Sequence, residues 1–105
     1  MKWTNNFDYV NKDVPLFQQE VTQALSHYSY HISKGTYMMV DIQGTFDGRC
    51  FSLSDPAFLT MTKNGGLMGP TDIGGAGVNV FFFENHKECN RFCSEGWLRP
   101  KEKLP

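Results

Sequence analysis

The chain lacks an excess of charge of either sign, and it lacks any long hydrophobic run. Its 105 residues carry 10 basic and 11 acidic side chains, a formal net charge of −1, with the two signs mixed along the sequence. Without a basic stripe there is no electrostatic basis for binding nucleic acid or an anionic membrane surface. The apolar runs, such as residues 78–83, are far too short to span a bilayer. The sequence therefore predicts no nucleic-acid partner and no membrane association.

Cysteine is scarce, and the first ten residues contain no apolar signal core. Three cysteines cannot all pair within one chain, which argues against a disulfide framework and favours a reducing compartment. An N-terminus without a signal core indicates that the chain is not secreted, so we expect a cytoplasmic protein. The length and an apolar content of 40 % predict one domain over residues 1–105 with a modest core.

Hydrophobic periodicity predicts one helix near the N-terminus. Apolar residues recur every three to four positions over residues 15–27, and Asp13 is placed to cap the first turn. Residues 28–32 and 36–42 are rich in aromatic and branched side chains and flank the turn residues 33–35. This pattern predicts an antiparallel hairpin.

The second half of the chain contains shorter signals. Residues 45–49 predict a turn and residues 50–53 a short strand. Residues 76–86 have strand propensity, although their position after a glycine-rich stretch favours a helix. The charged end after Pro100 has no apolar pattern, so we expect it to be frayed.

Two acids and an amide lie close together in the middle of the sequence. Asp41 ends the apolar run 37–40 and cannot be buried there without a partner at a tolerable cost, so it is expected to face a cleft. Gln43 points to the same side if the strand continues, and Asp55 precedes Pro56, where a side chain can project from a loop. Together they predict Mg²⁺ and phosphate chemistry. The alternative is that Asp41 is a strand-end cap or a solvated turn residue.

A second group consists of possible zinc ligands. Cys89 and Cys93 are four residues apart, which would place both thiols on one face of a helix, with His86 just upstream. A tetrahedral structural zinc site needs a fourth ligand, for which His27 and His31 are the remaining histidines. The alternative is a pair of buried free cysteines acting as small apolar residues.

The glycine-rich stretch over residues 63–77 predicts a loop that other backbone can approach closely. No Gly-Lys-Ser/Thr follows it, so as a nucleotide-binding motif it is weak. A plain surface turn is the alternative.

Four segments occur in an order that resembles the C-terminal part of the alpha-kinases, a family of atypical protein kinases. In that family a histidine-containing SHFTY-like segment precedes a catalytic D-L-Q-G, followed by T-D-P, a G-P-x-x-L-G-x-x-G loop and H-x-C-N-x-x-C. The matching segments here are SHYSYHISKGTYMMVDIQG (26–44), LSDPAF (53–58), MGPTDIGGAG (68–77) and HKECNRFC (86–93). The opening KWTNNFDYVN (2–11) is similar to an asparagine-rich stretch of the family, so the resemblance extends from Lys2 to about Leu98.

The resemblance implies an α+β fold with an antiparallel sheet and flanking helices, the C-terminal lobe of an alpha-type kinase domain with a structural zinc site. It also implies ATP, Mg²⁺ and Zn²⁺ as cofactors and a helix over 76–86. The implied roles are catalysis for Asp41, Mg²⁺ and ATP binding for Gln43 and Asp55, a peptide-groove loop containing Gly69, Gly74 and Gly77, and zinc ligation for His27, His86, Cys89 and Cys93.

Three features depart from the family pattern. The family's N-terminal lobe, with its phosphate-contacting lysine, is expected to be absent from residues 1–105. Two residues, Lys87 and Glu88, separate the second histidine from the first cysteine where the family has one. The segment 45–52 is longer than the family's usual link, which predicts a displacement of Asp55 relative to Asp41 and Gln43.

We therefore expect part of an alpha-type serine/threonine protein kinase that phosphorylates Ser or Thr of a protein substrate. Alone it should be inactive or nearly so, because a missing N-lobe or a partner chain would have to complete the ATP site. The alternative is a non-catalytic, zinc-stapled peptide-binding module or pseudokinase, which would bind peptides without nucleotide. A third reading, a metal-dependent phosphohydrolase using Asp41 and Asp55, predicts phosphatase activity without a kinase partner.

Overall fold

A computed structural model describes residues 1–6, 9–61, 66, 69 and 71–104. The parts of the predicted glycine-rich loop at 63–65, 67–68 and 70 lie outside these residues. The elements in chain order are α1 (Leu16–Ile32), β1 (Tyr37–Val40), β2 (Gly44–Phe46), β3 (Phe51–Leu53), β4 (Ala57–Thr60), α2 (Gly75–Val80) and a π-helical turn, η1 (Phe81–Asn85).

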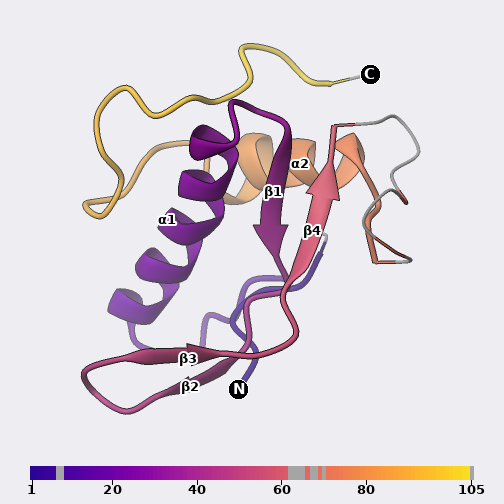
Figure 1. The fold of residues 1–105 in the computed structure, drawn as a ribbon. Helices are drawn as coiled ribbons and strands as arrows, with labels where there is room; N and C mark the ends of the chain where they lie inside the picture. The colour runs from indigo at the N-terminus through magenta and orange to yellow at the C-terminus, as the bar shows by residue number, and fades with distance from the viewer. Residues whose placement is uncertain (7–8, 62–65, 67–68, 70, 105) are drawn as a thin grey trace.

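The strands form two antiparallel pairs. β1 pairs with β4, with Tyr37 opposite Thr60 and Val40 opposite Ala57, while β2 and β3 form a separate hairpin. Figure 1 shows α1 alongside β1, α2 crossing behind the β1–β4 pair, and the β2–β3 hairpin extending from its end. The expected α+β class with antiparallel strands and flanking helices is confirmed, as two small sheets. No helix in the described part of the chain is both long and apolar enough to cross a bilayer.

The predicted hairpin over residues 28–42 was wrong in its first strand. Residues 28–32 continue α1 to Ile32, five residues past the predicted end at His27, and β1 pairs with β4 instead. Aromatic content favours a strand only where the side chains pack on a sheet. Here Tyr30 is buried on the helix, with its ring 4.9 Å from that of Phe82.

The turn residues that suggested a hairpin instead terminate α1. The N–H of Gly35 donates to the carbonyl of Tyr30 at 2.8 Å, and the N–H of Lys34 donates to that of His31 at 3.0 Å. Lys34 has φ 56° and Gly35 has φ 76°, so the chain adopts the left-handed geometry of a Schellman motif. A Lys-Gly pair can end a helix as well as join two strands, which is why the local sequence was ambiguous.

The expected Asp13 cap is also absent from the start of α1. Pro15 occupies the N-cap position and makes no side-chain cap hydrogen bond. A residue of the helix itself holds the segment that precedes α1, because the Gln19 side-chain amide donates to the carbonyl of Val14 at 2.9 Å. The backbone N–H of Asp13 donates to Asn11 Oδ1 at 2.9 Å, so this stretch is a local turn.

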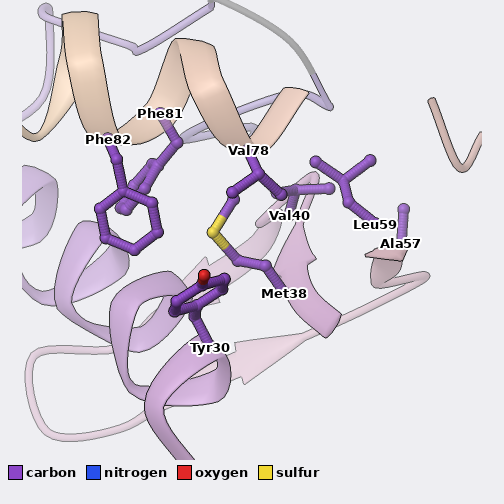
Figure 2. Packing of buried hydrophobic residues seen from close by; sticks show 8 residues of the cluster. All are labelled: Tyr30, Met38, Val40, Ala57, Leu59, Val78, Phe81 and Phe82. Atoms are coloured by element: carbon purple, nitrogen blue, oxygen red, sulfur yellow. The ribbon is translucent and has the colours of Figure 1, made fainter. Parts of the chain in front are cut away.

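The stretch at 76–86 is helical, as expected from its position, and it carries one side of the core. Val78, Phe81 and Phe82 are buried against Met38 and Leu59 of the β1–β4 pair, as Figure 2 shows. After Val80 the helix widens into η1. The N–H of His86 donates to the carbonyl of Phe81 at 2.7 Å, which closes the wide turn. The widened turn sets the backbone position of His86.

The C-terminal end was predicted to be frayed, but the described part is attached to the domain. The Asn79 side chain donates to the Leu104 carbonyl at 2.9 Å and accepts from the Leu104 N–H at 2.8 Å. Leu104 also packs against the main core cluster. These contacts use backbone groups and one side chain, so hydrophobic periodicity could not reveal them.

Gly77 allows α2 to approach its neighbours closely. A Cβ at this position would lie 2.5 Å from Leu59 Cδ1 and 2.8 Å from the Asn6 carbonyl oxygen. We expect Gly77→Ala to lower the free energy of unfolding by about 1–3 kcal/mol, because backbone as well as a side chain would have to move. Urea unfolding measures the loss, and Ala76→Ser on the exposed face of α2 is the matched control. Equal stability of the two variants would contradict the close approach.

Candidate active site and metal centre

Asp41 lies immediately after β1, in a backbone conformation that requires support. Its φ is 58°, in the left-handed region, which an aspartate tolerates better than most residues. The N-terminal segment supplies that support. The Asp41 N–H donates to the Asn5 carbonyl at 3.2 Å, the Ile42 N–H donates to Thr4 Oγ1 at 3.0 Å, and the Trp3 N–H donates to the Ile42 carbonyl at 2.8 Å. The segment thus orients the carboxylate.

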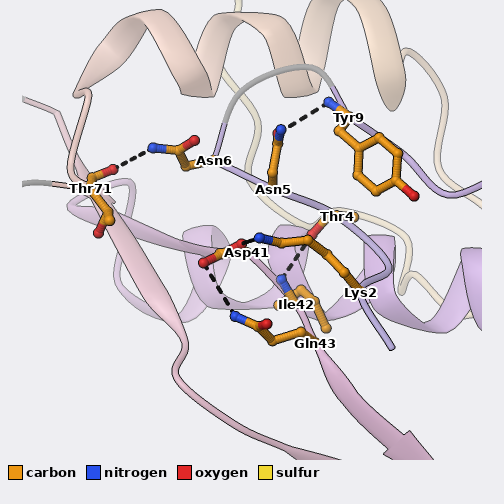
Figure 3. A network of polar contacts seen from close by, with 9 residues as sticks. All are labelled: Lys2, Thr4, Asn5, Asn6, Tyr9, Asp41, Ile42, Gln43 and Thr71. Atoms are coloured by element: carbon orange, nitrogen blue, oxygen red, sulfur yellow. Dashed lines mark hydrogen bonds and ion pairs between the residues drawn. The ribbon is translucent and has the colours of Figure 1, made fainter.

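The Asp41 carboxylate contacts one cation and one amide (Figure 3). Lys2 Nζ lies 2.7 Å from Oδ1, and Gln43 Nε2 donates to Oδ2 at 3.4 Å. The strand does not continue through Asp41, yet the two side chains expected to share a side do meet. Lys2 was given no role by the sequence, since nothing local marks a lysine that will reach Asp41 through the fold.

Asp55 lies at the same end of the sheet but in a different setting. It is exposed and has φ 47°. The neighbouring Ser54 N–H donates to the Gln43 carbonyl at 3.0 Å, and Ala57 pairs with Val40 directly before Asp41. Among the described contacts, none joins the Asp55 side chain to Asp41 or Gln43. The structure therefore brings Asp41 and Gln43 together, whereas the exposed Asp55 side chain contacts neither of them in the part of the chain that the structure describes.

The long link at 45–52 forms the β2–β3 hairpin. Its base is tight, because a Cβ at Gly44 would lie 1.9 Å from the Ser52 carbonyl oxygen. At its tip the Asp47 carboxylate accepts from the N–H groups of Arg49 and Cys50, each at 2.8 Å. The extra residues thus project outward as a hairpin. At the end of the hairpin the Ser54 N–H donates to the Gln43 carbonyl, so the chain comes back beside Gln43.

The three glycines proposed for the substrate loop have different environments. Gly69 has φ 105° and open space around its Cα, Gly74 has φ 69° and precedes α2, and Gly77 lies within α2. The loop is therefore shorter than expected, because residues from Gly75 onward are helical. The Asn6 side chain donates to the Thr71 carbonyl at 2.8 Å, which joins the loop to the N-terminal segment beside Asp41.

Asp72 anchors this loop to β4. Its carboxylate is buried and accepts from the Thr60 N–H at 2.9 Å, the Thr60 hydroxyl at 2.6 Å and the Gly74 N–H at 3.0 Å. The sequence left Asp72 without a definite role. Its burial follows from the donors that surround it, which come from two separate segments.

We expect Asp72→Ala to lower the free energy of unfolding by about 3 kcal/mol or more, because buried donors would lose a charged acceptor. Asp72→Asn retains one acceptor oxygen and should lose less. Thermal or urea unfolding compares the two. A neutral Asp72→Ala would show that the three hydrogen bonds contribute no net stability.

Four possible metal ligands converge between α1 and the C-terminal third of the chain. The ligand atoms of His27, His86, Cys89 and Cys93 all lie within 4.8 Å of one another. His27 Nδ1 is 3.2 Å from His86 Nε2, 3.6 Å from Cys89 Sγ and 3.7 Å from Cys93 Sγ, while Cys93 Sγ is 3.5 Å from His86 Nε2. A tetrahedral zinc ion sets nitrogen and sulfur ligands about 3.3–3.8 Å apart. The four separations given above lie close to that range, and the ligand atoms as a group lie within 4.8 Å of one another.

The hydrogen bonds of the two histidines direct a lone pair of each into this cluster. His27 Nε2 donates to the Leu98 carbonyl at 2.8 Å, and His86 Nδ1 donates to Gln23 Oε1 at 3.0 Å. Each ring then presents its other nitrogen, unprotonated, to the cluster. Two lone pairs facing each other at 3.2 Å repel unless a cation lies between them.

Without a metal ion, burial disfavours the charged forms of the histidine and cysteine side chains in this cluster. It lowers the pKa of His86 to about 4, assisted by the charges of His27 and Arg99, and it lowers the pKa of His27. Burial also raises the pKa of the Cys93 thiol to about 11. A proton is therefore a poor occupant of the space between the two rings. A divalent cation suits it better, because it binds neutral imidazole and favours thiolate over thiol.

The cysteines reach the cluster from turns, so the expected helix over residues 89–93 is absent. The Cys93 N–H donates to the Asn90 carbonyl at 3.1 Å, and the Asn90 side chain donates to the Glu20 carbonyl on α1 at 2.9 Å. The family has one residue between the second histidine and the first cysteine, and the extra residue here does not prevent His86 and Cys89 from lying in the same cluster. His31 stays outside the cluster, where its Nδ1 accepts from the Leu98 N–H at 3.0 Å.

The chain is similar in sequence and fold to proteins of one known family. The model of the alpha-kinase family matches residues 1–93. Myosin heavy chain kinase C of Dictyostelium discoideum is 34 % identical over 94 % of the chain, and human eukaryotic elongation factor 2 kinase is 30 % identical over all of it. The solved alpha-kinase domain of myosin heavy chain kinase A in complex with AMPPCP superposes with a TM-score of 0.69 and 31 % identity over 89 % of the chain.

The match covers only part of each relative. The chain spans 11 % and 13 % of the two curated kinases and 32 % of the solved kinase domain. The family match extends from the N-terminal segment that supports Asp41 to the second cysteine of the cluster. The protein therefore belongs to the alpha-kinase family.

Proposed function

We propose that the chain is the C-terminal lobe of an alpha-type protein serine/threonine kinase domain, which transfers a phosphoryl group from ATP to a Ser or Thr hydroxyl of a protein. The observation that carries the proposal is the Asp41 carboxylate, which the fold holds between Lys2 and Gln43 at one end of the β1–β4 pair. Two further findings support it. Relatives in the same family are named as kinases, and the solved domain of one of them is a complex with the ATP analogue AMPPCP.

The roles follow from the charges in phosphoryl transfer, in which positioning and charge neutralisation supply most of the catalysis. Asp41 orients the substrate hydroxyl and accepts its proton. Lys2 holds the carboxylate in place and adds a positive charge beside the transferring group. Gln43 and Asp55 supply oxygen ligands for Mg²⁺, a cation that takes few protein ligands and keeps several waters. Bound Mg²⁺ would neutralise charge on the ATP phosphates.

The second part of the proposal is a structural zinc ion held by His27, His86, Cys89 and Cys93. Its support is the tetrahedral spacing, the facing lone pairs and the mixed imidazole and thiolate donor set, which suits zinc. The ion would join α1 to the segment after η1 and so contribute folding free energy directly. Unpaired thiols, which all three cysteines have, agree with a cytoplasmic setting.

We propose that ATP binding requires protein groups beyond residues 1–105. The chain spans 32 % of the solved domain, so we propose that residues 1–105 act together with an N-terminal lobe, in the same or another chain, and have little activity without it. The protein substrate would bind beside Asp41 and the loop anchored by Asp72.

Native mass spectrometry with metal analysis, in a titration with Mg-ATP, tests the metal and nucleotide parts together. One zinc per chain and no retained ATP is the expected result. Joining the chain to the N-terminal lobe of myosin heavy chain kinase C should then produce Ser/Thr phosphorylation. A folded, ATP-binding fusion without transfer would refute the kinase assignment and favour a non-catalytic peptide-binding module. Phosphatase activity of the chain alone would favour the hydrolase.

A further inference from the structure

Residues 97–99 reach the metal cluster although none of them is a ligand. The backbone of Leu98 is held between two histidines of α1. Its carbonyl accepts from His27 Nε2 at 2.8 Å, and its N–H donates to His31 Nδ1 at 3.0 Å. The carbonyl thus determines which nitrogen of His27 is protonated, and with it the orientation of a proposed ligand.

Trp97 covers the same histidines. Its ring meets His27 edge-on at a centroid distance of 5.4 Å and stacks on His31 at 6.2 Å with an interplanar angle of 20°. Phe82 also meets the His27 ring edge-on, at a centroid distance of 5.1 Å. The imidazole is therefore held by contacts with two aromatic rings and by one hydrogen bond to the Leu98 carbonyl.

Arg99 acts on the second histidine through its backbone. Its guanidinium donates to the carbonyls of His86 and Lys87, the first two residues of the turn that leads to Cys89. The guanidinium also lies 5.2 Å from the centroid of the Phe82 ring. Arg99 thus fixes the backbone on which His86 is carried, from a position outside the 1–93 family match.

We propose that residues 97–99 are positioning residues of the metal centre, so that zinc binding and docking of this segment onto α1 stabilise each other. Leu98 and Trp97 orient the His27 ring, and Arg99 orients His86. The inference rests on the proposed zinc site and extends it. The coupling is reciprocal, because a segment that favours the metal-binding geometry must itself be favoured by the metal. Outer-shell partners of this kind are typically worth about 10–100-fold in metal affinity.

The test is the zinc dissociation constant of the full 105-residue chain, measured by competition with a chromogenic chelator. Arg99→Ala should bind zinc about 10–100-fold more weakly. Arg99→Lys, which keeps the positive charge but carries its N–H donors on a single nitrogen, should recover part of the loss. Arg49→Ala, in the exposed β2–β3 turn, is the matched control and should not change the affinity. Arg99→Ala within twofold of the parent chain would overturn the inference.

A second variant separates positioning from general stability. His31→Phe keeps a ring against Trp97 but removes the acceptor for the Leu98 N–H, while all four ligands and Arg99 remain. It should weaken zinc binding and change the visible absorption of the Co²⁺-loaded chain, which reports ligand geometry. An unchanged spectrum and affinity in His31→Phe would count against the inference even if Arg99→Ala did not fold.

The two proposals fail in different ways. A parent chain that retains neither zinc nor Co²⁺ would overturn the metal site and this inference with it. A parent chain that holds one zinc, with Arg99 and His31 variants of equal affinity, would leave the metal site intact and overturn only the role of residues 97–99.

Discussion

Replacing Cys93 with alanine is expected to abolish stoichiometric zinc binding and to destabilise the chain severely. Cys93 Sγ lies 3.7 Å from His27 Nδ1 and 3.5 Å from His86 Nε2, so its removal opens one corner of the tetrahedron. A bound ion present at about 1,000 times its dissociation constant adds about 4 kcal/mol of stability. For a domain of this size that corresponds to about 16–32 °C in melting temperature. Metal analysis and thermal unfolding measure both effects.

Cys50→Ala provides the matched control, because Cys50 is an exposed free thiol in the β2–β3 turn. It should retain one zinc and the parent melting temperature. Chelation of the parent chain should reproduce the Cys93→Ala melting curve. If chelation and Cys93→Ala both leave the melting temperature unchanged, the four side chains form a buried polar cluster without a structural ion.

Asp41→Asn in the fusion with a relative's N-terminal lobe is expected to reduce phosphoryl transfer by about 10²–10⁴-fold, the usual contribution of a general base. The fold should survive. The ion pair that is lost joins Asp41 to a Lys2 side chain that is 45 % exposed, and such pairs are worth at most about 1 kcal/mol. Transfer of labelled phosphate from ATP to a Ser/Thr peptide measures the activity, and thermal unfolding checks the fold.

Asp47→Asn is the control for this experiment. The Asp47 carboxylate accepts only from the N–H groups of Arg49 and Cys50 among the hydrogen bonds described, so its change should leave transfer intact. Equal activity of the Asp41 and Asp47 variants would remove Asp41 from the mechanism. Lys2→Met should give an intermediate loss, since it removes a charge beside Asp41 and leaves the proton acceptor.

Local patterns predicted much of the fold. The period of apolar residues revealed α1, and the short strand expected at 50–53 is β3. Thr45 and Phe46, which were expected in a turn, instead belong to β2 and pair with β3. For residues 76–86 the local pattern was ambiguous, and it was the resemblance to the family that favoured the helix. The misplaced strand at 28–32 arose because aromatic residues satisfy both patterns. Only the packing of Tyr30 on Phe82 distinguishes them.

The sequence predicted which residue types form the site and their order along the chain. It did not predict which of them contact one another. Asp41 and Gln43 stand two residues apart, so their proximity was visible in the sequence. Lys2 and Leu98 were not visible, because each acts on a residue far away in the chain. The hydrogen bond between His27 and Leu98, for example, spans 71 residues.

Residue identity and spacing are enough to indicate the family, the order of its motifs and the chemical types of the candidate ligands. The pairing of Lys2 with Asp41, the anchoring of the loop by Asp72 and the contacts of residues 97–99 with the histidines depend on the fold. The physical reason is that hydrogen bonds and ion pairs act over a few ångströms, and chain folding alone determines which distant residues come within that range.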